Sequence, residues 1–193
     1  FHYLIGMPKY WSPSIQTVLD SWQEARAAGL RIVFIEGNRD FFLDSKELEP
    51  YVDWTGSQYH FTAGSRRFLL RHGDRVNQRD IAYRFWRLVS KSFMVRAVAT
   101  VLPGPIANAM FAKMEARIRQ TNAKYRSHRP EDALRCAAEQ AWASGIDTVL
   151  WGHFHDRWEL QRGDHLAMVV PAWLDSNAVM IVEADGTWSI DAE

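Results

Sequence analysis

Residues 146–155 read Ile-Asp-Thr-Val-Leu-Trp-Gly-His-Phe-His, a short apolar run that ends in two histidines separated by one residue. The first five residues are typical of a buried β-strand. Neutral imidazole binds a metal ion without first losing a proton, so His153 and His155 are candidate metal ligands. Gly152 would allow the backbone turn that aims both rings at one site. The alternative is a purely structural pair of histidines at a strand end.

Two other predicted strands end in residues of the same kind. Residues 31–36 are followed by 37–40 (Gly-Asn-Arg-Asp), and residues 67–71 are followed by 72–74 (His-Gly-Asp). Open α/β sheets place their binding sites at the carboxyl ends of strands. The three loops together therefore predict one site, although Asn, Asp and Gly also form ordinary turns.

The side chains in these loops suit a site with two metal ions. Two ions about 3.5–4 Å apart can bind phosphoester oxygens, generate hydroxide and stabilise the leaving group. Mixed nitrogen and oxygen donors without cysteine suit Mn²⁺, Fe or Zn²⁺ better than a structural thiolate zinc site. The candidate metal ligands are Asn38, His72, His153 and His155.

Three further side chains have predicted supporting roles. Arg39 is next to Asn38, where a guanidinium could hold a phosphate through paired hydrogen bonds and take part in catalysis. Asp40 and Asp74 are predicted to orient Asn38 and His72, respectively.

Length and composition predict a single globular domain. A chain of 193 residues with 47% hydrophobic residues can bury a sizeable core, and its charge density excludes a disordered or fibrous protein. The single cysteine, Cys136, excludes an internal disulfide and favours a reducing compartment. No apolar run reaches the roughly 20 residues that a membrane-spanning helix needs.

Basic residues are concentrated in the middle of the chain. Residues 66–129 contain 15 Lys and Arg but only three Asp and Glu, although the formal net charge of the chain is zero. Such segregation produces a local field that attracts anionic partners. The alternative is that the arginines are scattered over solvated helix faces. No nucleic-acid-binding motif is recognised, so no nucleic acid partner is expected.

The order of predicted elements indicates an α+β fold with an insertion. Long basic helices rich in aromatic residues interrupt the predicted strands, and their position between two metal-type motifs places them beside the site. We predict a core of residues 1–79 and 144–193 and a helical cap of residues 80–143. The expected elements are helices over 12–29, 44–51, 81–101, 106–125 and 130–143, a hairpin over 58–71, and antiparallel strands over 157–161, 165–171, 178–183 and 188–190.

The order of the motifs Gly-Asn-x-Asp, His-Gly-Asp and Gly-His-x-His resembles the calcineurin-like metallophosphoesterases. Residues 37–43 (Gly-Asn-Arg-Asp-Phe-Phe-Leu), residues 80–83 (Asp-Ile-Ala-Tyr) and the basic insertion narrow the resemblance to the UDP-2,3-diacylglucosamine pyrophosphatases of lipid A biosynthesis. The similarity covers essentially the whole chain, including residues 172–173 (Ala-Trp). It implies the metallo-dependent phosphatase fold, a four-layer αββα sandwich with a helical cap.

The resemblance also implies a reaction and a set of site residues. It implies hydrolysis of UDP-2,3-diacylglucosamine to UMP and 2,3-diacylglucosamine 1-phosphate, with a binuclear Mn²⁺ site, at the cytoplasmic face of the inner membrane. The cap would meet the lipid part of the substrate or the membrane surface. By position, Asn38, His72, His153 and His155 match metal ligands and Arg39 matches the residue beside the phosphate, while the remaining substrate contacts are Asp80, Asn122 and Lys124.

One departure from the family pattern concerns the first residues. The family opens with an Asp-x-His motif and then a Gly-Asp whose Asp bridges both metals, and residues 1–6 look like the tail of the second motif. We therefore expect an N-terminally truncated stretch that lacks the first strand and binds metal weakly or at one position. The alternatives are another phosphoesterase with a nucleotide or phosphodiester substrate, and a non-catalytic protein that binds lipid or a partner.

Overall fold

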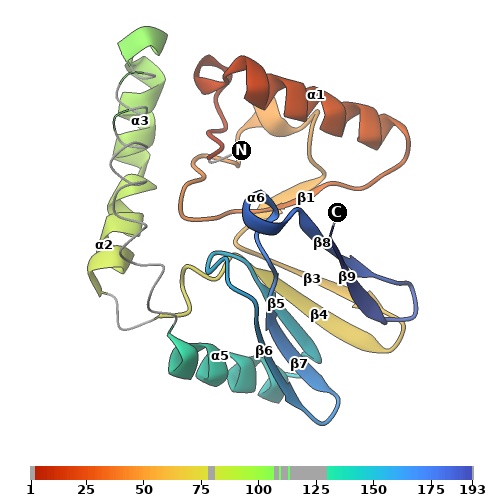
Figure 1. The fold of residues 1–193 in the computed structure, drawn as a ribbon. Helices are drawn as coiled ribbons and strands as arrows, with labels where there is room; N and C mark the ends of the chain where they lie inside the picture. The colour runs from red at the N-terminus through yellow and green to blue at the C-terminus, as the bar shows by residue number, and fades with distance from the viewer. Residues whose placement is uncertain (1–2, 78–80, 107–108, 110–112, 114–129, 193) are drawn as a thin grey trace. The chain divides into compact units, whose positions relative to one another are not determined.

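The computed structural model describes residues 3–77, 81–106, 109, 113 and 130–192 (Figure 1). It contains helices and a mixed sheet, as the predicted α+β class requires. The contacts divide the chain into two compact units. Unit 1 comprises Phe1–Gly56 and Asp80–Ser127, and unit 2 comprises Ser57–Arg79 and His128–Glu193. The predicted division into a core and an inserted cap stays a prediction.

Unit 2 is built on a five-stranded mixed sheet in the order β3-β4-β5-β7-β6. The three central strands β4, β5 and β7 run parallel, and the outer strands β3 and β6 pair antiparallel with their neighbours. The carboxyl ends of β4, β5 and β7 therefore lie at one edge of the sheet. The strands are β3 (Gln58–Ala63), β4 (Arg66–Arg71), β5 (Thr148–Trp151), β6 (Trp158–Arg162) and β7 (His165–Val169).

Two elements cover the faces of this sheet. Helix α5 (Glu131–Ala143) packs on the face that carries Val149, and the hairpin of β8 (Ala178–Val182) and β9 (Trp188–Ala192) packs on the face that carries Leu150 (Figure 1). Successive residues of a strand point to opposite faces, so β5 contributes to both cores and is buried throughout. The turn between β8 and β9 is made at Gly186, which has a φ of 89°.

Unit 1 places a helix over a short parallel strand pair. Helix α1 (Pro13–Ala27) begins after Ser12, whose hydroxyl accepts a hydrogen bond from the Ile15 N–H. Strand β1 (Val33–Ile35) pairs parallel with β2 (Trp54–Gly56), and Glu36 separates its end from Gly37. The buried apolar residues around α1 are Leu4, Ile15, Leu19, Leu43, Leu48 and Val52.

Two short 3₁₀ turns lie in unit 1, and one of them corrects a predicted helix. The helix expected over 44–51 is reduced to the 3₁₀ turn η2 (Lys46–Leu48), because Pro50 has no N–H with which to extend it. A second 3₁₀ turn, η1 (Pro8–Tyr10), precedes α1.

The helix predicted over 81–101 is two helices, α2 (Ile81–Ser90) and α3 (Phe93–Val101). Ser92 separates them because its side chain caps the second helix by accepting a hydrogen bond from the Val95 N–H at 3.4 Å. Most of the helix predicted over 106–125 lies outside the described residues. Among the residues that the structure describes, no helix has the length and apolar character needed to cross a membrane.

Candidate metal centre

Two of the predicted ligands meet at the carboxyl edge of the sheet in unit 2. His72 follows β4 and His153 follows β5, and these strands are parallel neighbours. The His153 Nδ1 lies 3.2 Å from the His72 Nε2, and the ring centroids are 5.0 Å apart. The topology of the sheet thus brings together two imidazoles that are far apart in the sequence.

The spacing of the two nitrogens fits a shared metal ion. Zinc–nitrogen bonds of about 2.0–2.1 Å in a tetrahedral site separate two nitrogen ligands by roughly 3.3 Å. The observed 3.2 Å between His153 Nδ1 and His72 Nε2 is close to that value, and it also allows one ring to donate a hydrogen bond to the other. The donor set in unit 2 therefore suits a transition-metal cation.

The backbone that carries His153 and His155 is strained. The Phe154 N–H donates to the Gly152 carbonyl at 2.8 Å, and the Asp156 N–H donates to the Phe154 carbonyl at 2.7 Å. These are two consecutive three-residue turns, centred on His153 with a φ of 68° and on His155 with a φ of 64°. Turns of this kind with a positive φ are rare and strained, and such strain is concentrated at functional sites.

The glycine that matters for packing here is Gly73, not Gly152. The predicted turn at Gly152 does not use a positive φ at that residue, because the histidines themselves adopt it. Gly73 has a φ of 106°, and a Cβ there would lie 3.1 Å from the Phe154 ring and 3.2 Å from the Gly152 carbonyl. The lack of a side chain at residue 73 and its positive φ therefore favour the close approach of the loops after β4 and β5.

His155 has a different partner from His153. Its Nδ1 lies 2.6 Å from the Asp175 Oδ2. Asp175 belongs to α6 (Trp173–Ser176), a single turn that follows β7 and ends at Asn177 with a φ of 48°. The pairing arises because β7 is the parallel neighbour of β5, so the segments that follow both strands leave the same edge.

The loop of residues 37–40 in unit 1 is closed by Asp40. One carboxylate oxygen accepts a hydrogen bond from the Gly37 N–H at 2.8 Å, and the other accepts one from the Leu4 N–H at 3.0 Å. The carboxylate thereby fixes the ends of the loop that carries Asn38 and Arg39. Burial raises the pKa of Asp40 above its ordinary value, although these two hydrogen bonds act in the opposite direction.

Helix α2 and the residue that follows it hold the same loop from another side. The Lys91 ammonium donates to the Gly37 carbonyl at 3.0 Å and forms an ion pair with Glu36, and the Arg87 guanidinium lies 3.4 Å from the same carbonyl. Burial lowers the pKa of Lys91, while its hydrogen bond to Glu36 raises it. The position of the predicted ligand loop is therefore tied to two cations, the buried Arg87 and the half-buried Lys91.

The raised pKa of Asp40 predicts a specific pH dependence. A carboxyl with a raised pKa in the folded state contributes stability below its unfolded-state pKa, and that contribution is lost as the pH rises through the folded-state pKa. The wild-type protein should therefore lose stability relative to Asp40→Asn as the pH rises from about 3.8. Urea unfolding of both proteins between pH 3.5 and 7 measures this difference, and a pH-independent difference would contradict it.

The remaining predicted residues fall into two groups. Asp74 is buried, with 9% of its surface exposed. Asp80, Asn122 and Lys124 lie outside the described residues. Among the side chains that the structure describes, no set of three or more His, Cys, Asp or Glu forms a ready metal site.

Sequence reasoning missed Asp175, Arg87, Lys91 and Glu36. Asp175 contacts a histidine 20 positions away in the sequence, and no local pattern signals that contact. Arg87 and Lys91 belong to a basic segment with many arginines, and the sequence does not indicate which of them is buried. Their burial against Gly37 is a consequence of tertiary packing.

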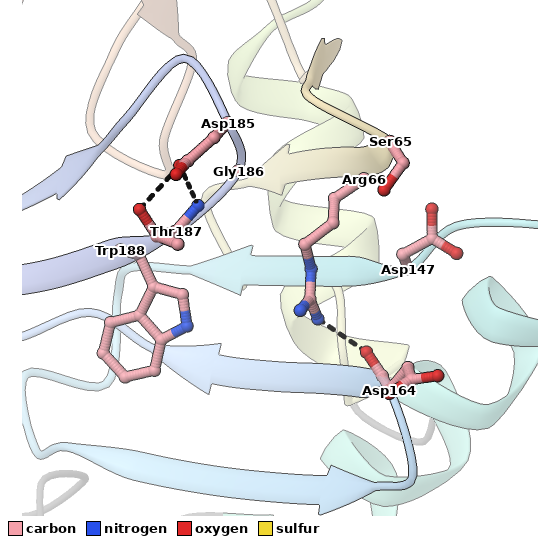
Figure 2. A pocket seen from close by; sticks show the side chains of 8 residues that line it. All are labelled: Ser65, Arg66, Asp147, Asp164, Asp185, Gly186, Thr187 and Trp188. Atoms are coloured by element: carbon pink, nitrogen blue, oxygen red, sulfur yellow. Dashed lines mark hydrogen bonds between the residues drawn. The ribbon is translucent and has the colours of Figure 1, made fainter.

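A hollow of about 680 Å³ lies at the opposite end of the same strands, where β4 and β5 begin (Figure 2). Several of its polar groups bond to neighbouring strand residues and turns of unit 2. The Asp147 carboxylate accepts a hydrogen bond from the Arg67 N–H at 2.7 Å, and the Asp185 carboxylate accepts one from the Thr187 N–H at 2.8 Å. We therefore assign this hollow no part in the candidate site.

Comparison with known proteins gives a consistent set of relatives. No family model matches the chain. Curated proteins named UDP-2,3-diacylglucosamine hydrolase do match it. The protein from Stenotrophomonas maltophilia is 29% identical over 196 residues, covering 93% of this chain and 77% of the relative. The Serratia proteamaculans protein is 27% identical, covering 82% of this chain and 68% of the relative. The Proteus mirabilis protein is 23% identical, covering 90% of this chain and 75% of the relative. The resemblance predicted from the motifs is thus confirmed: over most of its length, this chain resembles the UDP-2,3-diacylglucosamine hydrolases and, through them, the metallophosphoesterases.

Proposed function

We propose that this protein is a metal-dependent hydrolase that cleaves the pyrophosphate bond of UDP-2,3-diacylglucosamine in lipid A biosynthesis. The products would be UMP and 2,3-diacylglucosamine 1-phosphate. The observation that carries the proposal is the pair His72 and His153, whose ring nitrogens lie 3.2 Å apart at the sheet edge where a site is expected. The relatives named as hydrolases of this substrate support the choice of substrate.

The metal ligands we propose are His72, His153, His155 and Asn38. Bound divalent ions, with Mn²⁺ as the proposed metal and Fe or Zn²⁺ as substitutes, would supply a water-derived nucleophile and neutralise charge on the phosphates. The imidazoles offer nitrogen donors, and the Asn38 amide offers an oxygen. Arg39 would bind phosphate oxygens through its planar guanidinium, and Asp40 holds the backbone on which Asn38 and Arg39 lie.

Two further proposals concern the complete fold and the location of the protein. We propose that the complete fold is the αββα sandwich of the metallophosphoesterases, with a helical cap that includes α2 and α3. We also propose that the protein binds peripherally to the cytoplasmic face of the inner membrane. Apolar side chains exposed on α2 and α3 support this, because such side chains can insert at the membrane interface. They include Ile81, Phe85, Trp86, Leu88, Phe93, Met94, Val98 and Val101.

The reaction is tested by UMP release from UDP-2,3-diacylglucosamine, using the full chain that the gene encodes. We expect release that depends on Mn²⁺ and stops on addition of a chelator. Bis(p-nitrophenyl) phosphate and oligonucleotides are assayed separately as alternative substrates. If the protein hydrolysed these compounds but released no UMP, the substrate would be a different phosphoester. If it hydrolysed none of the compounds, a binding role would be favoured.

Membrane association is tested separately by sedimentation with anionic vesicles, and a protein that did not sediment with them at low salt would reject it.

A further inference from the structure

Asp175 is a carboxylate with no role assigned by the sequence motifs, and it lies directly against a proposed metal ligand. Its Oδ2 is 2.6 Å from the His155 Nδ1. The other two proposed histidine ligands, His72 and His153, have ring nitrogens 3.2 Å apart. Both members of the pair are partly exposed, at 36% of the His155 side chain and 45% of the Asp175 side chain.

The position of Asp175 is fixed by its own backbone. Its N–H donates to the Ala172 carbonyl at 3.0 Å, and the single turn of α6 ends where the Asn177 N–H donates to the Trp173 carbonyl at 2.8 Å. The turn follows β7, whose ladder to β5 continues through the Val170 N–H and the Trp151 carbonyl at 2.8 Å. The acceptor is therefore held in register with the loop that carries His155.

We propose that Asp175 is a positioning residue that prepares His155 for metal binding, an inference that rests on the proposed metal site. A neutral imidazole that donates its Nδ1–H to a carboxylate keeps its lone pair on Nε2. Metal-binding histidines commonly have such a carboxylate partner, which fixes the ring orientation and strengthens the nitrogen donor. Asp175 thereby directs the Nε2 of His155 to the metal.

The competing explanation is a surface ion pair without function. Exposed pairs of this kind contribute little to stability, so loss of Asp175 should leave the fold intact. The strained φ of 64° at His155 argues for a role of the ring in its present place, because strain persists only where the surroundings enforce it. The two explanations differ in what they predict for metal affinity.

The test measures Mn²⁺ affinity by titration calorimetry on metal-free full chain, with circular dichroism to check folding. Asp175→Ala should bind Mn²⁺ about 10- to 100-fold more weakly than the wild type. Asp175→Asn should recover part of the loss, because its amide oxygen can accept the same hydrogen bond. Asp191→Ala removes an exposed aspartate of β9 and should bind like the wild type.

Measuring the effect of Asp175→Ala in the His155→Ala protein shows whether it acts through His155. In the His155→Ala protein, the further change Asp175→Ala should have no effect on affinity, because the ring that it positions is gone. Equal affinity of Asp175→Ala and wild type, or an equal loss in both backgrounds, would overturn the inference. A wild type that binds no Mn²⁺ overturns it together with the proposed metal site. Mn²⁺ binding without UMP release contradicts only the proposed reaction.

Discussion

Replacing His153 by alanine should lower Mn²⁺-dependent UMP release on the order of 10³-fold, because a lost metal ligand removes several kcal/mol of transition-state stabilisation. His153 is chosen because its Nδ1 lies 3.2 Å from the His72 Nε2, at the point where β4 and β5 end together. Steady-state rates at saturating Mn²⁺ measure the loss. Mn²⁺ affinity should fall in parallel, which separates a ligand from a residue that contacts only substrate.

The matched control is His60→Ala. His60 is an exposed histidine on β3, in the same unit as His153 and in the sheet whose strand β5 precedes His153. Its removal should leave both the rate and the Mn²⁺ affinity unchanged. A His153→Ala protein that is folded and retains a rate within threefold of the wild type would show that the metal is held elsewhere.

The strands of this fold were predictable because the signals that define them are local. The run that ends at Trp151 is apolar and buried, and Gly152 follows it. The Ser-Pro pair at the start of α1 and the Asp-Gly turn between β8 and β9 were predictable for the same reason. In each case the physical cause lies within a few residues of the element.

Features that depend on contacts distant in the sequence were not predictable. The pattern over 157–171 indicates antiparallel strands, but it does not show that β7 also pairs parallel with β5. That pairing decides where α6 lies and therefore which carboxylate meets His155. For the candidate site, the sequence identifies the types of donor, whereas the positive φ of His153 and His155 emerges only from the packed loops.

Gly6→Ala should destabilise the protein strongly and impair the loop that carries Asn38 and Arg39. A Cβ on residue 6 would overlap the Phe42 carbonyl oxygen and lie 2.8 Å from the Ser45 hydroxyl. The first contact is with backbone, so the segment at Phe42 has to move. That segment is also joined to Gly6 by the bond from the Gly6 N–H to the Phe41 carbonyl at 2.9 Å.

Because Phe41 directly follows Asp40, a displacement at residues 41–42 is transmitted to the predicted ligand loop. Overpacking in a well-packed interior typically costs about 1–3 kcal/mol, and backbone contacts at this distance favour the upper end of that range. We therefore expect the urea unfolding free energy to fall by about 3 kcal/mol. UMP release should also fall under conditions in which the variant is fully folded, because Asn38 and Arg39 are displaced.

Gly104→Ala provides the matched control for this prediction. A Cβ there would meet only the Lys9 carbonyl oxygen at 3.9 Å, an ordinary contact distance. The same Gly-to-Ala change should therefore leave activity unchanged and alter stability by less than about 1 kcal/mol. If Gly6→Ala behaved like Gly104→Ala in both measurements, the close packing of residues 41–42 on Gly6 would not hold the loop. The loop would then be held by other contacts, among them those of Asp40, Arg87 and Lys91.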